Sequence, residues 1–275
     1  MKPVDFNFER PASLTDALEL MSRDDMNVVA LAGGQSLLPM MNFRMVRPDI
    51  LVDLNGLDEL RGSEIGPDRA RIGAMTRYSD LASNAELMAR LPLLASALPH
   101  VANSAIRNRG TLGGSIAMAD PTTEMPAVML ALGATIRLAS RDGERSVAAD
   151  DFYLGYYESA LESGELVIAI DVPTAAPGDA FGFYEVARRR GDRAMAGAAI
   201  ARRNHEPRIA FFSVSDRPVR GFSAERILGE NAASVEAAEG SLKEIDFHGD
   251  LHGGPDLKRH LARIVLRRAW AELQP

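Results

Sequence analysis

The sequence contains no cysteine among its 275 residues. Disulfides, cysteine-ligated zinc and cysteine-ligated iron–sulfur clusters are therefore excluded within this chain. The absence is typical of proteins in a reducing compartment, and we predict that the protein is cytoplasmic. Any redox chemistry must then depend on a bound organic cofactor or on metals that a partner carries.

Long hydrophobic runs are also missing. No apolar stretch approaches the roughly 18–20 residues that cross a bilayer. The N-terminal sequence MKPVDFNFERP lacks the hydrophobic segment of a secretory signal. We therefore expect a soluble protein with no membrane span.

The charge balance argues against nucleic acid as a partner. Lys and Arg number 31 against 38 Asp and Glu, which gives a net charge of −7. An acidic chain without a dominant basic face repels phosphate backbones. Two local clusters, Arg188–Arg190 and Arg202–Arg203, are expected to form ion pairs or to face a partner protein.

Few residue patterns indicate acid–base or metal chemistry. Among the five histidines, only His248 and His252 lie close in sequence, and we interpret them as solvated loop residues. The G-x-S-x-G motif of serine hydrolases is absent. The aromatic cluster in Phe152–Tyr157 is interpreted as core packing. We predict no metal site and no catalytic residues.

Hydrophobic periodicity predicts an α+β fold in three consecutive lobes. The lobes are expected at residues 1–60, 61–175 and 176–275, and the last boundary falls in the linker Pro173–Gly178. The small-residue run Ala194–Ala201 is placed between two strands. The expected strands are Phe6–Phe8, Asn27–Leu31, Ile50–Leu54, Leu60–Ile65, Arg71–Ala74, Thr135–Ala139, Glu165–Val172, Phe181–Val186 and Ile209–Val214; the expected helices are Leu14–Ser22 with Ser13 and Asp16 as its capping pair, Leu37–Arg44, Asp80–Leu87, Leu91–Leu98, Met125–Ala131, Ala224–Leu228, Ala232–Leu242 and Asp256–Leu273.

Two glycine-rich segments are the main indication of function. AGGQS, at Ala32–Ser36, follows a strand and precedes a helix, and TLGGS occupies Thr111–Ser115. Adjacent glycines let backbone N–H groups converge on an anion. Neither segment is a G-x-G-x-x-G fingerprint or a P-loop. Taken alone, Ala32–Ser36 is equally compatible with a tight turn.

Two carboxylates follow the second segment. Asp120 and Glu124 lie at the start of the predicted helix Met125–Ala131. They can accept hydrogen bonds from sugar or polyol hydroxyls or from a ring N–H. Glu124 alone is better explained as a partner of the helix dipole. Together with both glycine pairs, however, the carboxylates predict that one large phosphate-bearing cofactor is bound.

These segments resemble those of a known family. LAGGQSLLPMMNFRMVRPDILVDLN (Leu31–Asn55) and RGTLGGSIAMADPTTEMPAVMLALGA (Arg109–Ala134) look like the two FAD-binding signatures of the flavin-carrying medium subunit of molybdenum hydroxylases. YEVARRRGDRAMAGAA (Tyr184–Ala199) resembles the segment that opens the C-terminal lobe there. The resemblance implies the vanillyl-alcohol-oxidase-type (PCMH-type) FAD-binding fold in two lobes, followed by a C-terminal α+β flavoprotein domain.

The resemblance also implies a division of labour. A large subunit would carry a molybdenum–pterin centre, a small subunit two [2Fe–2S] clusters, and this chain FAD, with the complex expected to be a dimer of heterotrimers. Electrons would pass from the clusters through FAD to an external acceptor. An aromatic N-heterocycle and carbon monoxide are both open as the substrate, and the heterocycle is preferred because the AGGQSLLPMMNFRM segment looks closer to those members of the family. A self-sufficient flavin oxidase and a scaffold that has lost its cofactor are the alternatives.

The cofactor contacts implied by the resemblance fall in the same segments. Ser115 replaces an Asn that is common in the family, and Glu124 occupies the position of a carboxylate that binds cofactor hydroxyls. One departure is Arg193, where the family often has an aromatic residue over the flavin ring. The predicted FAD-binding residues are Ala32, Gly33, Gly34, Gln35, Ser36, Leu37, Ala102, Thr111, Gly113, Gly114, Ser115, Asp120, Glu124, Arg188 and Arg193.

Overall fold

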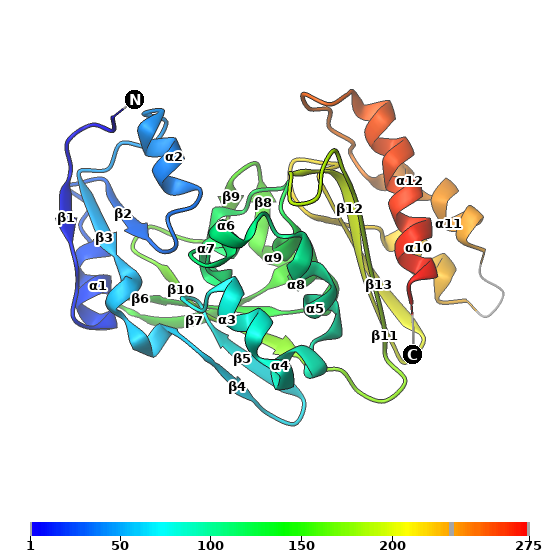
Figure 1. The fold of residues 1–275 in the computed structure, drawn as a ribbon, viewed down its shortest axis with the longest axis horizontal. Coiled ribbons are helices and arrows are strands. Elements are labelled where there is room, and N and C mark those ends of the chain that lie inside the picture. Colours follow the sequence, from blue (N-terminus) through cyan, green and yellow to red (C-terminus); the bar gives the residue numbers. More distant parts are fainter. Residues whose placement is uncertain (1, 231–233, 274–275) are drawn as a thin grey trace.

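The computed structural model describes residues 2–230 and 234–273, and its three main sheets follow one another along the chain (Figure 1). The first sheet is parallel with strand order β1-β3-β2. Its elements are β1 (Asn7–Glu9), α1 (Leu14–Met21), β2 (Val28–Leu31), α2 (Leu37–Asn42), β3 (Ile50–Asp53) and the 3-10 turns η1 (Leu54–Gly56) and η2 (Asp58–Leu60).

Local sequence signals account for most of this part. The Ser13 hydroxyl accepts a hydrogen bond from the Asp16 N–H at 3.1 Å, which confirms the predicted cap of α1. Strand β3 is buried throughout, but β2 is only half-buried. The expectation of a buried strand at Asn27–Leu31 was therefore wrong in burial, because β2 is an edge strand of the sheet.

The second sheet is antiparallel, and β10 is its central strand. Its order is β4-β5-β10-β6-β7, so the chain leaves the sheet after β7 and returns to insert β10 between β5 and β6. Its strands are β4 (Ser63–Ile65), β5 (Arg69–Gly73), β6 (Thr135–Ser140), β7 (Gly143–Ala148) and β10 (Leu166–Pro173), and β8 (Tyr153–Gly155) and β9 (Glu158–Ser159) form a separate hairpin.

The helices of this part include several that the sequence did not predict. Asp80–Leu87 was expected to be one helix, but Asn84 ends the first of two and caps the second through its side chain. The glycine pair Gly113–Gly114, where no helix was expected from the sequence, lies inside a helix. The helices are α3 (Tyr78–Ser83), α4 (Ala85–Arg90), α5 (Pro92–Ala97), η3 (Leu98–His100), α6 (Ser104–Arg107), α7 (Leu112–Met118), α8 (Glu124–Leu132) and α9 (Ala149–Phe152).

The third sheet is antiparallel in the order β11-β12-β13-β14. The run Ala194–Ala201, placed between strands by the sequence prediction, is instead part of β12. The predicted helix Ala232–Leu242 begins outside the described residues, and its described part is α11. The elements are β11 (Ala180–Ala187), β12 (Ala194–Arg203), β13 (Glu206–Phe212), β14 (Val219–Arg220), α10 (Phe222–Leu228), α11 (Val235–Gly240), η4 (Leu242–Glu244) and α12 (Pro255–Ala271).

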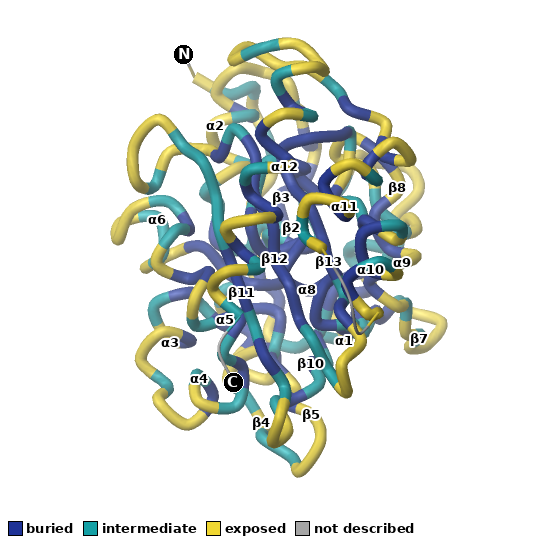
Figure 2. Tube along the Cα trace, turned by 90° about the vertical axis from the view of Figure 1, so that its right-hand side faces the viewer, coloured by how far each residue is buried: buried dark blue, intermediate teal, exposed yellow. Residues whose placement is uncertain are grey.

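Helices on both faces explain the small residues of β12. Helix α12 packs on one face of the third sheet and α8 on the other. Every residue of α8 is buried, and so are the central residues of β12 (Figure 2). A strand covered on both faces reads as continuously apolar, and small side chains let the helices approach closely. One hydrophobic core therefore joins α5 and α8 to the third sheet.

The α+β class predicted from the sequence is confirmed. The lobe boundaries, at 1–60, 61–175 and 176–275, stay a prediction about folding units. Among the described residues, no helix has both the length and the apolar character needed to cross a bilayer.

Gly197 provides a test of the packing of β12. A Cβ atom at this position would lie 2.0 Å from Cζ of Phe212. We expect Gly197→Ala to lower the free energy of unfolding by about 1–3 kcal/mol, because the ring must move within a dense core. Urea unfolding followed by circular dichroism would measure the loss.

Gly240→Ala is the matched control, since a Cβ there meets nothing within 4 Å and the residue ends α11. It should leave stability unchanged or raise it slightly. Equal unfolding midpoints for the Gly197→Ala variant and the unmodified protein would contradict the packing argument.

Candidate functional site

The two glycine-rich segments touch each other. A Cβ atom at Gly33 would lie 2.3 Å from the carbonyl oxygen of Arg109 and 2.8 Å from Cα of Gly110. A Cβ at Gly114 would lie 3.3 Å from Cβ of Ala32. Segments about 80 residues apart in the chain are thus in direct backbone contact, which only glycine permits at Gly33.

The first segment presents free backbone donors. Gly34 has a φ of +72°, so the chain turns sharply before α2 begins at Leu37. Within the described residues, no acceptor of the chain is bonded to the N–H groups of Gly33 through Ser36. The Ser36 hydroxyl caps nothing, and the Gln35 amide donates to the Gly33 carbonyl at 3.0 Å. Four consecutive free N–H groups suit an anionic ligand.

The second segment has a different role from the one expected. The N–H of Gly113 donates to the Ala74 carbonyl at 2.9 Å, and the N–H of Gly114 donates to the Thr111 hydroxyl at 3.2 Å. The N–H of Ser115 donates to the Thr111 carbonyl at 3.2 Å. These N–H groups are therefore not free to converge on an anion. The glycines instead remove side chains, so that α7 packs closely on Ala74 and on the first segment.

A support beneath the first segment was missed by the sequence prediction. The Asn55 side-chain amide donates to the Ala32 carbonyl at 2.9 Å and to the Asp53 carboxylate at 2.7 Å. Arg10 pairs with the same carboxylate at 2.6 Å. The signal was present in the sequence: Ala32 and Asn55 follow parallel neighbouring strands, and the ends of such strands lie at one edge of the sheet.

Glu124 is a buried carboxyl group at the site. Glu124 is 5% exposed. Among the described residues, no side-chain or backbone donor other than its own N–H is hydrogen-bonded to its carboxylate. Burial raises the pKa of Glu124 to about 7; its own N–H and the nearby His100 lower it, while Glu185 and Asp120 add to the rise. A buried carboxyl group whose one donor among the described residues is its own N–H suits a ligand that supplies further donors.

Both carboxylate oxygens of Asp120, by contrast, already have hydrogen-bond or ion-pair partners in the chain. One carboxylate oxygen accepts hydrogen bonds from the N–H and the hydroxyl of Thr122, at 2.9 and 2.7 Å. The other lies 3.0 Å from the Arg193 guanidinium and 3.4 Å from the Tyr157 hydroxyl. Asp120 thus anchors Arg193 and its own turn. Its predicted contact with a cofactor would require one of these partners to be displaced.

The turn between β11 and β12 completes the site. Gly191 has a φ of +83°, and a Cβ there would lie 2.7 Å from the Ala102 carbonyl oxygen. Ala102 itself has a φ of 44°, and Arg107 donates to its carbonyl at 2.8 Å. Arg193 lies next to Asp120, whereas Arg188 is an exposed residue of the turn.

Tyr78 borders the site and was also missed. Its N–H donates to the Gly110 carbonyl at 3.1 Å, and its ring packs on Gly110. Its hydroxyl is buried with no group in hydrogen-bonding geometry. Burial raises the pKa of Tyr78 above its usual range, and the nearby Ser115 hydroxyl offsets this only in part. An unpartnered buried hydroxyl beside Glu124 again fits a ligand-binding region.

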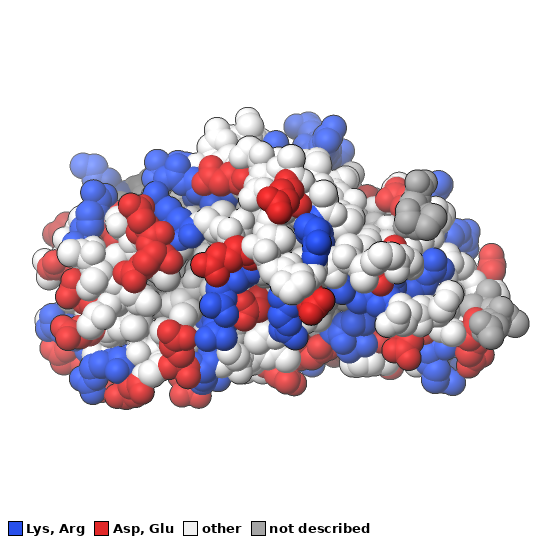
Figure 3. Space-filling view, turned by 90° about the horizontal axis from the view of Figure 1, so that it is seen from below, with Lys and Arg blue, Asp and Glu red and all other residues white. Residues whose placement is uncertain are grey.

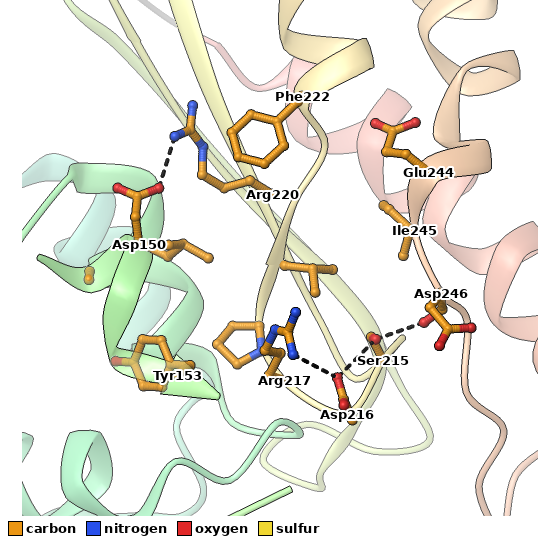
Figure 4. Close-up of a pocket in the computed structure, with 14 residues that line it drawn as sticks. Asp150, Tyr153, Ser215, Asp216, Arg217, Arg220, Phe222, Glu244, Ile245 and Asp246 are labelled. Carbon is orange, nitrogen blue, oxygen red and sulfur yellow. Dashed lines mark hydrogen bonds and ion pairs between the residues drawn. The ribbon is translucent and has the colours of Figure 1, made fainter. Parts of the chain in front are cut away.

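A separate cavity of about 410 Å³ lies between α9 and the segments that follow β13 (Figure 4). None of the predicted site residues lines it. Its charged side chains pair with one another or with neighbours: Asp150 pairs with Arg220 at 2.9 Å and with Arg208 at 2.6 Å. This cavity leaves few free groups for a ligand, and we do not assign it to the site.

The aromatic cluster Phe152–Tyr157 divides in two. Phe152 and Tyr153 are buried as expected, but Tyr156 and Tyr157 are about half exposed. Their interpretation as core packing was wrong, because β8 and β9 form a hairpin whose turn points to solvent. Within the described ranges, no three His, Asp or Glu side chains are grouped so that they could hold a metal ion.

Known proteins and family models match this chain over nearly its full length. Residues 4–175 match the family model described as FAD binding domain in molybdopterin dehydrogenase. Residues 182–273 match the CO dehydrogenase flavoprotein C-terminal domain. The carbon monoxide dehydrogenase medium chain of Hydrogenophaga pseudoflava is 37% identical over 98% of this chain and 99% of its own. Caffeine dehydrogenase subunit beta of Pseudomonas sp. is 38% identical over 98% and 95%.

Solved structures agree with the sequence relatives. Carbon monoxide dehydrogenase from Hydrogenophaga pseudoflava superposes with a TM-score of 0.94 at 36% identity, covering 100% of both chains. Quinoline 2-oxidoreductase from Pseudomonas putida gives 0.91 at 36% identity, over 99% of this chain and 98% of the other.

Glu124 makes the stability of the ligand-free chain depend on pH. Because its folded pKa is raised from 4.5 to about 7, its stabilising contribution is full below pH 4.5 and is lost as the pH rises through 7. We expect Glu124→Gln to raise the free energy of unfolding by up to about 3 kcal/mol at pH 8 and by little at pH 4.5. Urea unfolding at both pH values would measure this difference.

Glu86→Gln, at an exposed position on α4, is the matched control. An equal gain in the free energy of unfolding at pH 8 in both variants would show that Glu124 is not the group responsible.

Proposed function

Because the chain belongs to the FAD-binding family of the molybdopterin dehydrogenases, we propose that it is the electron-transfer subunit of a molybdenum hydroxylase. In this role it takes electrons from the [2Fe–2S] clusters of a partner and delivers them through FAD to an external acceptor. The observation that carries the proposal is the direct contact between the two glycine-rich segments, of which the first, Gly33–Ser36, presents a run of free N–H groups.

FAD is the cofactor of this family, and the predicted vanillyl-alcohol-oxidase-type fold with a C-terminal flavoprotein domain is confirmed. When bound, FAD supplies a group that accepts and releases electrons. The residues fit it: the N–H groups of Gly33–Ser36 would bind the pyrophosphate, and Glu124 would accept hydrogen bonds from cofactor hydroxyls. Ala102 and Arg193 would lie on the flavin side.

The remaining predicted residues shape this site. Leu37 begins the helix that follows the pyrophosphate segment, and Ala32 is held by Asn55 beneath it. Thr111, Gly113 and Gly114 form the wall against that segment, and Ser115 turns its hydroxyl toward Tyr78. Asp120 and Arg188 complete the proposed set of FAD-binding residues.

The partners follow from what this chain lacks. Without cysteine it holds no iron–sulfur cluster of its own. We propose a large molybdenum–pterin subunit and a small subunit with two [2Fe–2S] clusters, assembled as a dimer of heterotrimers in the cytoplasm. The relatives are named medium chains or subunits, which supports assembly with other chains. It also disfavours the alternative of a self-sufficient oxidase.

For the substrate of the complex, we propose an aromatic N-heterocycle. Relatives named for caffeine and nicotine, at 38% and 34% identity, support this class. Others of similar identity are named for carbon monoxide and glyceraldehyde. Turnover by the purified complex of a panel of heterocycles, aldehydes and carbon monoxide would test it, and oxidation of carbon monoxide alone would contradict it.

The first prediction about FAD binding concerns Gly114. A valine there would place its Cβ 2.8 Å from the Thr111 hydroxyl and 3.3 Å from Cβ of Ala32, and would push the two segments apart. We expect Gly114→Val to abolish FAD retention, measured by flavin absorption of the purified complex. Gly240→Val, where space is open, should retain FAD. Full flavin occupancy in the Gly114→Val protein would show that the assignment is wrong.

The second prediction concerns the pH dependence of FAD binding. If FAD hydroxyls donate to Glu124, the bound state favours the ionised carboxyl group, whose pKa is about 7 in the free chain. Affinity should then rise about tenfold per pH unit up to pH 7 and level off above it. Fluorescence titration from pH 5.5 to 8.5 would measure the profile. In Glu124→Gln this dependence should disappear; an unchanged profile would exclude the contact.

A further inference from the structure

Three consecutive arginines lie on the turn between β11 and β12. Arg188, Arg189 and Arg190, which we call the arginine turn, are all exposed. The turn is closed by a hydrogen bond from the Asp192 N–H to the Arg189 carbonyl at 3.1 Å. Across the described ranges, none of the three guanidinium groups forms an ion pair or a side-chain hydrogen bond.

The other arginine cluster behaves differently. Arg203 donates to the carbonyls of Thr174 and Pro173 at 3.0 and 3.1 Å and lies 3.7 Å from the Asp179 carboxylate. Arg202 lies over the Trp270 ring at 6.0 Å. The expectation that arginine clusters form ion pairs or face a partner therefore separates into two cases. Arg202 and Arg203 therefore stabilise the fold through their contacts, whereas the side chains of the arginine turn form no ion pair or side-chain hydrogen bond within the described residues.

Three consecutive arginines occur at one place in the sequence, and there all three residues are exposed. The protein carries a net charge of −7, and on the face seen in Figure 3 acidic and basic side chains alternate. Within the sequence Arg188–Arg193, one carboxylate, Asp192, stands among four arginines. Like charges held together repel and raise the free energy of the folded chain. An anionic partner would relieve that repulsion.

The arginine turn adjoins the flavin side of the proposed FAD site. Gly191 packs on the carbonyl of Ala102, and Arg193 pairs with Asp120 at 3.0 Å. In Figure 1 the turn lies at the upper ends of β11 and β12, on the same side of the molecule as α2 and α6. A partner that bound there would approach the edge of the cofactor at close range.

We propose that the arginine turn is the docking site for an acidic electron-carrier protein that serves as the external acceptor; this inference rests on the proposed function. Three exposed side chains on a turn present a convex surface, which suits the face of a protein. A small anion is instead held by donors that converge on it. Each docked carrier takes one electron, so the oxidation of one FADH₂ reduces two carriers and releases two protons.

The charge pattern suits a transient encounter. A local patch of one sign raises the association rate by about 10- to 1000-fold at low ionic strength, and salt screens it. Interfaces of redox proteins are small and dissociate readily. The local patch matters because two proteins of net negative charge otherwise repel each other.

The test uses an oxidised acidic [2Fe–2S] ferredoxin as the probe. Its association with the purified complex is measured by surface plasmon resonance over a range of ionic strength, a readout that requires no flavin chemistry. The test variant is Arg189→Glu with Arg190→Glu. The matched control is Arg141→Glu with Arg226→Glu, two exposed positions far from the turn in the chain that change the net charge equally.

We expect the association rate of the unmodified complex to fall as salt is added, although this chain and the ferredoxin are both acidic. In the test variant the rate at low salt should fall at least tenfold and then rise with salt, while the control should stay within about twofold to threefold. Equal effects in both variants, or a rate that rises with salt in the unmodified complex, would overturn the proposal. So would weaker NAD⁺ binding with ferredoxin binding intact, because the turn would then serve a small phosphate-bearing acceptor.

The same experiment distinguishes a failure of the proposed function from a failure of the proposed docking site. If the chain retained no FAD, the function would be wrong, yet ferredoxin binding would still report on the arginine turn. If FAD were retained and binding ignored the turn, only the docking site would be excluded.

Discussion

The backbone contact between Gly33 and Arg109–Gly110 is the constraint on which the site depends. It leaves no room for a Cβ atom, so a loop of the first sheet and the segment before α7 must meet at glycine. That meeting sets Ala32 against Gly114 and leaves the N–H groups of the first loop turned away from other acceptors of the chain. Asn55 holds the loop from below, because the parallel strands β2 and β3 end at the same edge of their sheet.

Small residues also determine how closely the helices pack on the third sheet. The third sheet is held between α8 and α12, and glycine and alanine in β12 let both helices approach it. Helix α8 thereby fixes two things at once: the junction with the C-terminal part and the position of its first residue, Glu124. The chain keeps a carboxyl group there whose ionisation lowers the stability of the ligand-free protein. Such a group is more easily explained by binding than by folding, since function often retains locally unfavourable residues.

Most charged side chains in the interior are paired and stabilise the fold, whereas a few charged groups near the proposed site are not. Most buried or half-buried carboxylates are paired with arginine, as in Asp53 with Arg10 and Glu225 with Arg220. Glu124 and the arginine turn depart from that pattern, and both lie at the proposed site. The position of Arg193 is also informative, because Asp120 holds it in an ion pair at the junction with the C-terminal part.

The sequence by itself determined the α+β class, the cap of α1 and both glycine-rich segments, and its lack of cysteine excludes cysteine-ligated iron–sulfur clusters within this chain. These properties are local or compositional, so short-range rules suffice. Only the tertiary structure decided that Gly113 and Gly114 serve helix packing, that Ala194–Ala201 is a strand and that Asp120 is saturated while Glu124 is not. Those outcomes depend on contacts between residues far apart in the chain, where burial and the available partners override local preference.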